Sequence, residues 1–167
     1  YVNSDVVLPK NVFFDARRIL NIAEQYRPGE VVLSGSRHDC SSQNNDEYVN
    51  GETKLPAPDA PINYFKSCVL HAPTGKDYWI FRRNFWYRHG GIPGFMLGRF
   101  IWDDYLALVA NMFGMFVDVS PIVQVFHLGH DYTHTKASGR DELVIGSGRK
   151  LNLRLMEEAW SKIGPYR

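Results

Sequence analysis

The first 36 residues alternate between two apolar runs and one amphipathic segment, which limits the folds that the chain can adopt. Residues 1–8 and 30–36 form short apolar runs, and Pro28 and Gly29 precede the second. Residues 12–25 between them have the apolar spacing of a helix. A strand, a helix and a strand with brief connections predict an α/β fold, a mixed, mostly parallel sheet flanked by helices. The apolar positions of the helix are Val12, Ala16, Ile19, Leu20 and Ala23.

Length and charge narrow the class further. With 167 residues, 44% of them hydrophobic, the chain fits one globular domain over residues 1–167. The net charge of +1 gives no reason to expect nucleic acid as a partner. No apolar run approaches the roughly twenty residues of a membrane span, and no signal peptide is visible. Cys40 and Cys68 are far apart, so neither a disulfide framework nor a zinc knuckle follows.

A long polar connection occupies residues 38–76, where serines, asparagines and prolines replace the apolar pattern. Little regular structure is expected there, and an insertion of this length is either a binding loop or an insertion without a binding role. Arg37, His38 and Asp39 follow directly on a strand. They either face a site or form a surface ion pair.

Aromatic residues are dense after this insertion, in a predicted strand over residues 77–82 and just beyond it. Sugar rings have apolar faces that stack on aromatic rings, so these side chains suit a carbohydrate site. Their alternative role is core packing. The residues concerned are Tyr78, Trp79, Trp86 and Tyr87.

Two adjacent carboxylates, Asp103 and Asp104, begin a predicted helix that Gly114 ends. Carboxylates are favoured in a first helical turn by the helix dipole and the free amides. A carboxylate in a partly desolvated cleft can also take a proton from a hydroxyl nucleophile. Adjacent helical residues point about 100° apart, so only one of the two is expected to be a base. The expected buried face consists of Trp102, Leu106, Val109, Ala110 and Phe113.

Three histidines lie within eight residues, after two predicted strands over 115–119 and 122–126. They are His127, His130 and His134, and Asp131 lies among them. Such a group predicts a metal or phosphate site, and a mixed carboxylate and imidazole set suits Mn²⁺ or Mg²⁺ at least as well as Zn²⁺. The segment 136–149 is expected to close over a ligand or to be mobile, and 150–163 to form a helix.

Near the start of the chain, Asn3, Ser4 and Asp5 interrupt the first apolar run. Turns collect these residue types through side-chain to backbone hydrogen bonds. A carboxylate at a strand end can also bind a metal or a phosphate in α/β enzymes.

Several of these runs, in this order, resemble nucleotide-sugar-dependent glycosyltransferases of the GT-A fold, similar to family 2. The runs are YVNSDVVL, VVLSGSRHD, DYWIFRRNFW, GIPGFMLGRFIWDDYL and VFHLGHDYTH. The resemblance implies a nucleotide-sugar donor, a carbohydrate or glycoconjugate acceptor and a divalent cation, Mn²⁺ or Mg²⁺. It also implies a C-terminal, acceptor-side portion of such an enzyme, because the nucleotide-binding units of the family precede the acidic motif.

The resemblance implies a role for individual residues. Asp5 and His127 would bind the metal, and Asp103, with Asp104 beside it, would supply the base. The donor diphosphate would be bound by Asn3, Ser4, Asp5, Arg99, His130 and His134. The acceptor would be bound by Tyr78, Trp79 and Trp102.

Two other functions stay open, as does the cellular location. A metal-dependent hydrolase would use His127, His130 and His134 with a water nucleophile. A non-catalytic carbohydrate-binding module would use the aromatic residues alone. The cytoplasm is slightly favoured as the cellular location. The Golgi lumen is the alternative if the chain is a fragment of a eukaryotic protein.

Overall fold

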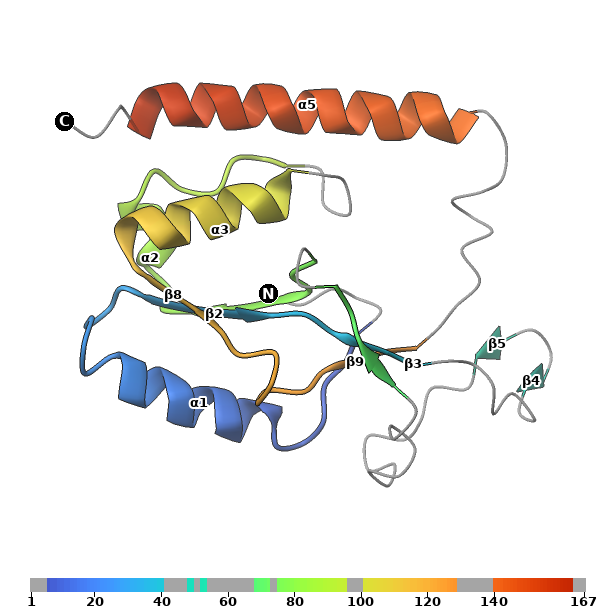
Figure 1. Ribbon diagram of the computed structural model, residues 1–167. Coiled ribbons are helices and arrows are strands. Elements are labelled where there is room, and N and C mark those ends of the chain that lie inside the picture. The colour runs from blue at the N-terminus through green and yellow to red at the C-terminus, as the bar shows by residue number, and fades with distance from the viewer. Residues whose placement is uncertain are drawn as a thin grey trace. The chain divides into compact units, whose positions relative to one another are not determined.

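The computed structural model describes residues 6–40, 48–49, 52–53, 68–72, 75–95, 101–128 and 140–163 (Figure 1). Contacts divide the chain into two compact units. The first unit comprises residues 1–26, 33–80 and 117–131, and the second comprises 27–32, 81–116 and 132–167. The described elements include both helices and mixed sheets, which confirms the α/β class.

A four-stranded sheet belongs to the first unit, with the order β1-β9-β3-β6. These strands are β1 (Val6–Val7), β9 (Phe126–Leu128), β3 (His38–Cys40) and β6 (Val69–Leu70). The pair β3 and β9 is parallel, whereas β9 pairs antiparallel with β1, and β3 with β6. The sheet is therefore mixed, as expected, but it is not mostly parallel, because two of its three described pairs are antiparallel.

Three further strands pair in the order β7-β2-β8: β7 (Tyr78–Phe81), β2 (Val31–Gly35) and β8 (Met115–Asp118). Every residue of the central strand β2 is buried. This burial explains the consecutive apolar residues Val31, Val32 and Leu33, because a strand covered on both faces does not alternate. Ser34 is buried as well, and its hydroxyl donates to the carbonyl of Tyr78 at 2.8 Å. The expected strands at 30–36, 77–82 and 115–119 are thus confirmed.

The first two predicted helices are also found. Helix α1 (Val12–Ala23) buries Val12, Ala16 and Ala23, three positions of its predicted apolar face. Helix α3 (Trp102–Phe113) buries Trp102, Tyr105, Leu106, Val109 and Ala110. A single turn, α2 (Phe85–Arg88), follows β7.

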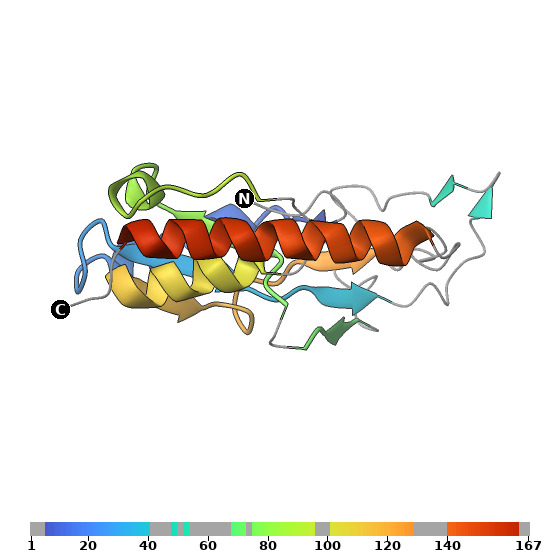
Figure 2. The same cartoon turned by 90° about the horizontal axis from the view of Figure 1, so that it is seen from above.

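The last helix, α5 (Arg140–Ile163), is longer than expected. It begins ten residues before the predicted helix at 150–163, so the expectation of a loose segment at 136–149 is wrong from Arg140 onward. Helices α3 and α5, both of the second unit, run side by side in Figures 1 and 2. No described helix is both long and apolar enough to cross a membrane.

The predicted strand over 122–126 is wrong except at its last residue. The amides of Ile122 and Val123 donate to the carbonyl of Val119, so the chain turns there before β9 begins at Phe126. The carboxylate of Asp118 supports this turn, because it accepts hydrogen bonds from both the amide and the hydroxyl of Ser120. A proline after the serine favours such a turn over a strand.

Short strands are also found inside the predicted loop at 38–76. Besides β3 and β6, the strands β4 (Tyr48–Val49) and β5 (Glu52–Thr53) form an antiparallel pair. The disulfide Cys40–Cys68 joins the end of β3 to the residue before β6. The sequence had given no reason to pair these two cysteines.

Candidate functional site

The structure describes only part of the predicted site. Asn3, Ser4, Asp5, Arg99, His130 and His134 lie outside the described residues. Those that are described are Tyr78, Trp79, Trp102, Asp103, Asp104 and His127.

The three aromatic residues expected to bind an acceptor are part of the core. Tyr78, Trp79 and Trp102 are 2%, 1% and 6% exposed. A ring buried to this extent offers no face on which a sugar could stack, so the acceptor assignment of these residues is corrected to core packing. Of the other aromatic residues expected to suit a carbohydrate, Trp86 is also buried, whereas Tyr87 is 86% exposed.

The two aspartates occupy the first turn of α3, as predicted, and differ in exposure. Asp103 is half-buried and Asp104 is exposed. The main-chain amide of Asp104 donates to the carboxylate of Asp103 at 3.1 Å. Of the two, Asp103 better fits the partly desolvated carboxylate that a base requires.

The residue before this helix, Ile101, has a φ of 91°. Such a conformation is strained for a β-branched side chain, and strain of this kind is often retained near functional sites. Ile101 lies two residues before Asp103 in the chain.

His127 is 1% exposed and lies in the middle of β9. Its backbone pairs with Val6 of β1 on one side and with Asp39 of β3 on the other. The Nδ1 atom of His127 lies 3.3 Å from a carboxylate oxygen of Asp39. This nitrogen of the imidazole therefore faces the carboxylate of Asp39.

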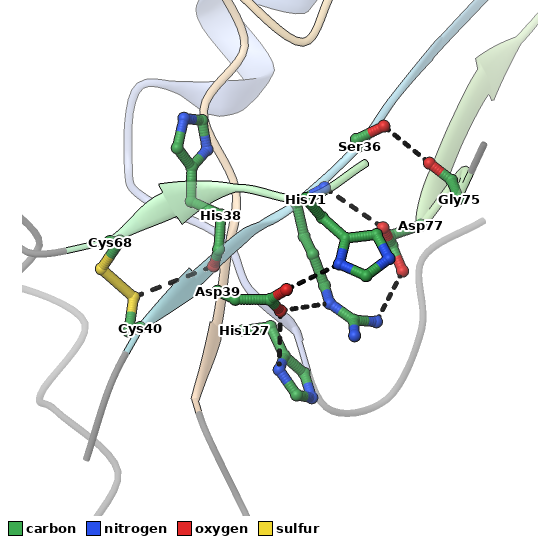
Figure 3. Close-up of polar contacts among 10 residues, drawn as sticks. Ser36, His38, Asp39, Cys40, Cys68, His71, Gly75, Asp77 and His127 are labelled. Atoms are coloured by element: carbon green, nitrogen blue, oxygen red, sulfur yellow. Dashed lines mark hydrogen bonds and ion pairs between the residues drawn. A yellow bond between two sulfur atoms is a disulfide. The ribbon is translucent and has the colours of Figure 1, made fainter. Parts of the chain in front are cut away.

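Asp39 lies at the centre of a polar group in the first unit, which we call the Asp39 cluster (Figure 3). Its members are Arg37, Asp39, His71, Asp77 and His127. Asp39 accepts hydrogen bonds from Arg37 Nε at 2.8 Å and from His71 Nδ1 at 2.6 Å. Arg37 also donates to both carboxylate oxygens of Asp77, through its main-chain amide at 3.1 Å and its Nη1 at 2.9 Å.

Strand register brings the Asp39 cluster together. Asp39 is opposite His127 across the parallel pair, and the amide of His71 donates to the carbonyl of Arg37, which continues the antiparallel pair by one step. Opposite residues in adjacent strands point to the same face, as do residues two apart along one strand. One face of the four-stranded sheet therefore carries the two imidazoles on either side of the Asp39 carboxylate, as Figure 3 shows.

Charge within the cluster keeps Asp39 ionised. Burial by itself would raise the pKa of Asp39, but hydrogen bonds from Arg37 and His71 and their positive charge outweigh this effect and lower it. An ionised carboxylate can only accept hydrogen bonds. The Nδ1 atom of His71 therefore carries a proton in its contact with Asp39.

Gly75 supports the ring of His71. A Cβ atom at this position would lie 2.9 Å from Cδ2 and 3.2 Å from Nε2 of His71, too close for ordinary packing. The carbonyl of Gly75 accepts a hydrogen bond from the hydroxyl of Ser36 at 2.6 Å, which fixes the glycine. The place of the imidazole is thus determined by its own backbone, by Asp39 and by Gly75.

The described residues do not by themselves form a metal site. Within the described ranges, no group of three or more histidine, cysteine, aspartate or glutamate side chains has the arrangement to hold a metal ion. The proposed partner of His127, Asp5, lies outside those ranges. The expected Mn²⁺ or Mg²⁺ remains a proposal.

A cavity of about 460 Å³ lies in the second unit, between residues 88–94 and the last turns of α5. Glu30 accepts from Arg88 and contacts Nε2 of His89, two residues that line the cavity. Asp103 and Asp104, the two described residues predicted to be catalytic, are not among those that line it.

Sequence reasoning anticipated part of the Asp39 cluster. Arg37 and Asp39 follow directly on a predicted strand, and His127 lies among other histidines, so a local pattern indicates all three. His71 and Asp77 were missed, since they lie at the end of the predicted loop and at the start of a strand without a recognisable motif. Only the pairing of β3 with β6 brings His71 to Asp39.

Comparison with protein-family models, with curated proteins and with solved structures found no match to this chain.

Proposed function

We propose that this chain carries the acceptor side of a glycosyltransferase that moves a sugar from a nucleotide-diphosphate sugar to a hydroxyl acceptor. The observation that carries the proposal is the pairing of Val6 with His127 in adjacent strands. Asp5, the residue before Val6 in the sequence, and His127 are the two residues that the family resemblance assigns to the metal. A strand pair that joins these two short segments, more than a hundred residues apart, is what a shared donor site would require.

The proposed base is Asp103. Its half-buried carboxylate in the first turn of α3 would accept the proton of the acceptor hydroxyl as that oxygen attacks the anomeric carbon. The bond from that carbon to the diphosphate breaks at the same time, and the nucleoside diphosphate leaves with additional negative charge. Asp104, which is exposed, would shape the helix start through the hydrogen bond that its main-chain amide donates to the carboxylate of Asp103.

The donor-side residues would stabilise the negative charge of the leaving diphosphate. Positive or hydrogen-bonding groups must face its new charge, which is the role proposed for Ser4, Arg99, His130 and His134. A divalent cation, when bound, would supply further stabilisation of the same charge. His127 would offer Nε2 to that cation, because its Nδ1 faces Asp39.

Calorimetric titration of the natural full-length protein with UDP- and GDP-sugars, with and without Mn²⁺, tests the donor side. Binding of one nucleotide sugar that strengthens with Mn²⁺ supports the proposal. Tight Zn²⁺ binding with indifference to every nucleotide sugar would overturn it in favour of the hydrolase.

Sugar transfer by an Asp103→Asn variant tests the base. Loss of a positioned base lowers the rate by about 10²- to 10⁴-fold, while donor binding should persist. An Asp15→Asn variant is the control, since Asp15 lies on α1 and bonds only locally to Asn11 in its described side-chain contact. Unchanged transfer by Asp103→Asn would remove Asp103 from this role.

A further inference from the structure

His71 has a fixed ring with one nitrogen directed away from its carboxylate partner. Its Nδ1 donates to Asp39 at 2.6 Å, and its side chain is 36% exposed. Because Nδ1 holds the proton, Nε2 of the neutral ring carries a lone pair. A carboxylate that orients an imidazole in this way is the arrangement by which enzymes prepare a histidine to accept a proton.

The charge balance of the Asp39 cluster favours a proton acceptor over an anion site. Asp39 and Asp77 contribute two negative charges, and Arg37 contributes one positive charge. The carboxylates of the cluster thus outnumber its guanidinium, since aspartate and arginine are ionised near neutral pH. Such a group favours protons over phosphate.

We propose that His71 is a general base whose Nε2 accepts a proton from water, with Asp39 as the residue that positions it. Water is the nucleophile, because the ring is open to solvent and no serine, threonine or cysteine contacts it among the described side-chain hydrogen bonds. The proposal does not depend on sugar transfer, since neither Asp103 nor the donor-binding residues take part. Its substrates are activated esters or comparable electrophiles that water can attack.

The reaction is balanced for a simple ester probe, p-nitrophenyl acetate. Nε2 takes one proton from water as the water oxygen forms a bond to the acyl carbon. The bond from that carbon to the nitrophenolate oxygen then breaks, which releases nitrophenolate and acetic acid. The acid carries the second proton of the water and loses it to solvent. The proton on Nε2 returns to solvent, so the imidazole is regenerated.

The tautomer of His71 gives a first test without any substrate. Long-range ¹H–¹⁵N spectra of the whole chain should show Nδ1 protonated and Nε2 unprotonated in the neutral ring. In Asp39→Ala the proton should move to Nε2, the tautomer preferred by a free imidazole, whereas Asp15→Ala should leave His71 unchanged. A proton on Nε2 of the unmodified chain, or a tautomer indifferent to Asp39→Ala, would overturn the proposal.

Hydrolysis of p-nitrophenyl acetate gives the second test. His71→Gln should lower the rate above background by about tenfold or more, toward the range expected for loss of a positioned base. His38→Gln is the matched control, because His38 is on the same strand as Asp39, one residue away, and packs its ring against Phe126. Equal rates for the unmodified chain and His71→Gln, with unchanged backbone spectra, would refute a base at His71.

Discussion

Tyr78 donates its phenolic hydroxyl to the main-chain carbonyl of Val123, 45 residues further along the chain, at 2.7 Å. The hydroxyl is buried, and burial together with the negative charges of Asp118 and Asp77 raises the pKa of Tyr78. The ring also passes directly over Gly35 in β2. One side chain thus joins the central strand to the turn that precedes β9.

Replacement of Tyr78 by phenylalanine should lower the free energy of unfolding by about 1 kcal/mol, because the carbonyl of Val123 loses its partner. Urea unfolding followed by circular dichroism measures the change. A variant as stable as the unmodified chain would mean that this hydrogen bond does not contribute.

Replacement of Gly35 by alanine should be more harmful. The added Cβ would lie 2.1 Å from the Tyr78 hydroxyl oxygen, so the ring or the strand must move, which typically lowers stability by about 1–3 kcal/mol. Gly94→Ala is the matched control, since an added Cβ there meets no atom within 4 Å. Equal unfolding midpoints for the two alanine variants would contradict the packing of Tyr78 on Gly35.

Asp118 should make stability depend on pH in the acid range. Burial raises its pKa, but hydrogen bonds from Lys76 and Ser120 lower it by more, so its net pKa is below the ordinary value. A carboxyl with a lowered folded-state pKa stabilises the fold above its unfolded pKa of about 3.9, and this contribution is lost as pH falls through the folded value.

The difference in urea midpoint between the unmodified chain and Asp118→Asn should therefore be larger near pH 6 than below about pH 3. Lys76→Gln should show the same trend more weakly, because it removes one partner of Asp118. A difference that stays constant over this range would show that Asp118 has the same pKa in both states.

The strained backbone at Ile101 predicts an unusual order of stability. Glycine adopts a positive φ readily, and relief of strain worth about 1–3 kcal/mol should exceed its loss of chain entropy. Ile101→Gly should therefore be more stable than Ile101→Ala by about 1 kcal/mol, as measured by urea unfolding. Alanine removes nearly the same side-chain atoms but retains the strain, so the reverse order would mean that Ile101 is relaxed.

Loss of the disulfide should be the largest of these effects. The bond links Cys40 to Cys68 across 28 residues, and a loop of this size contributes about 3 kcal/mol in the chain-entropy account. Cys40→Ala with Cys68→Ala should show this loss in urea, and reduction of the unmodified chain should reproduce it. The chain has only these two cysteines, so no alternative pairing complicates the measurement.

Helices and strands with a clear pattern of apolar residues are predictable from the sequence. Short strands that depend on pairing with distant segments are not. Val12–Ala23 and Trp102–Phe113 have enough turns for apolar spacing to show, and Val31–Gly35 begins with three consecutive apolar residues. Strands β3 and β6 have only three and two residues, so they carry no periodic pattern of their own. Their existence depends on pairing and on the disulfide.

The same distinction applies to the site. Asp103 and Asp104 were placed correctly at a helix start, because a local pattern determines that start. Tyr78, Trp79 and Trp102, predicted to bind a sugar, are core residues, whereas Tyr87 is exposed. Composition alone does not distinguish a stacking platform from interior packing. His71 was missed because its role depends on a carboxylate 32 residues away.

The bond between Cys40 and Cys68 also bears on where the protein resides. Disulfides persist in oxidising surroundings such as secretory lumens, the bacterial periplasm and the extracellular space, whereas cytosolic thiols are kept reduced. Cys40 follows Asp39, and Cys68 precedes the strand β6, which leads directly into His71. Reduction of this bond would therefore weaken the constraint that holds His71 beside Asp39. The structure therefore favours an oxidising compartment over the cytoplasm.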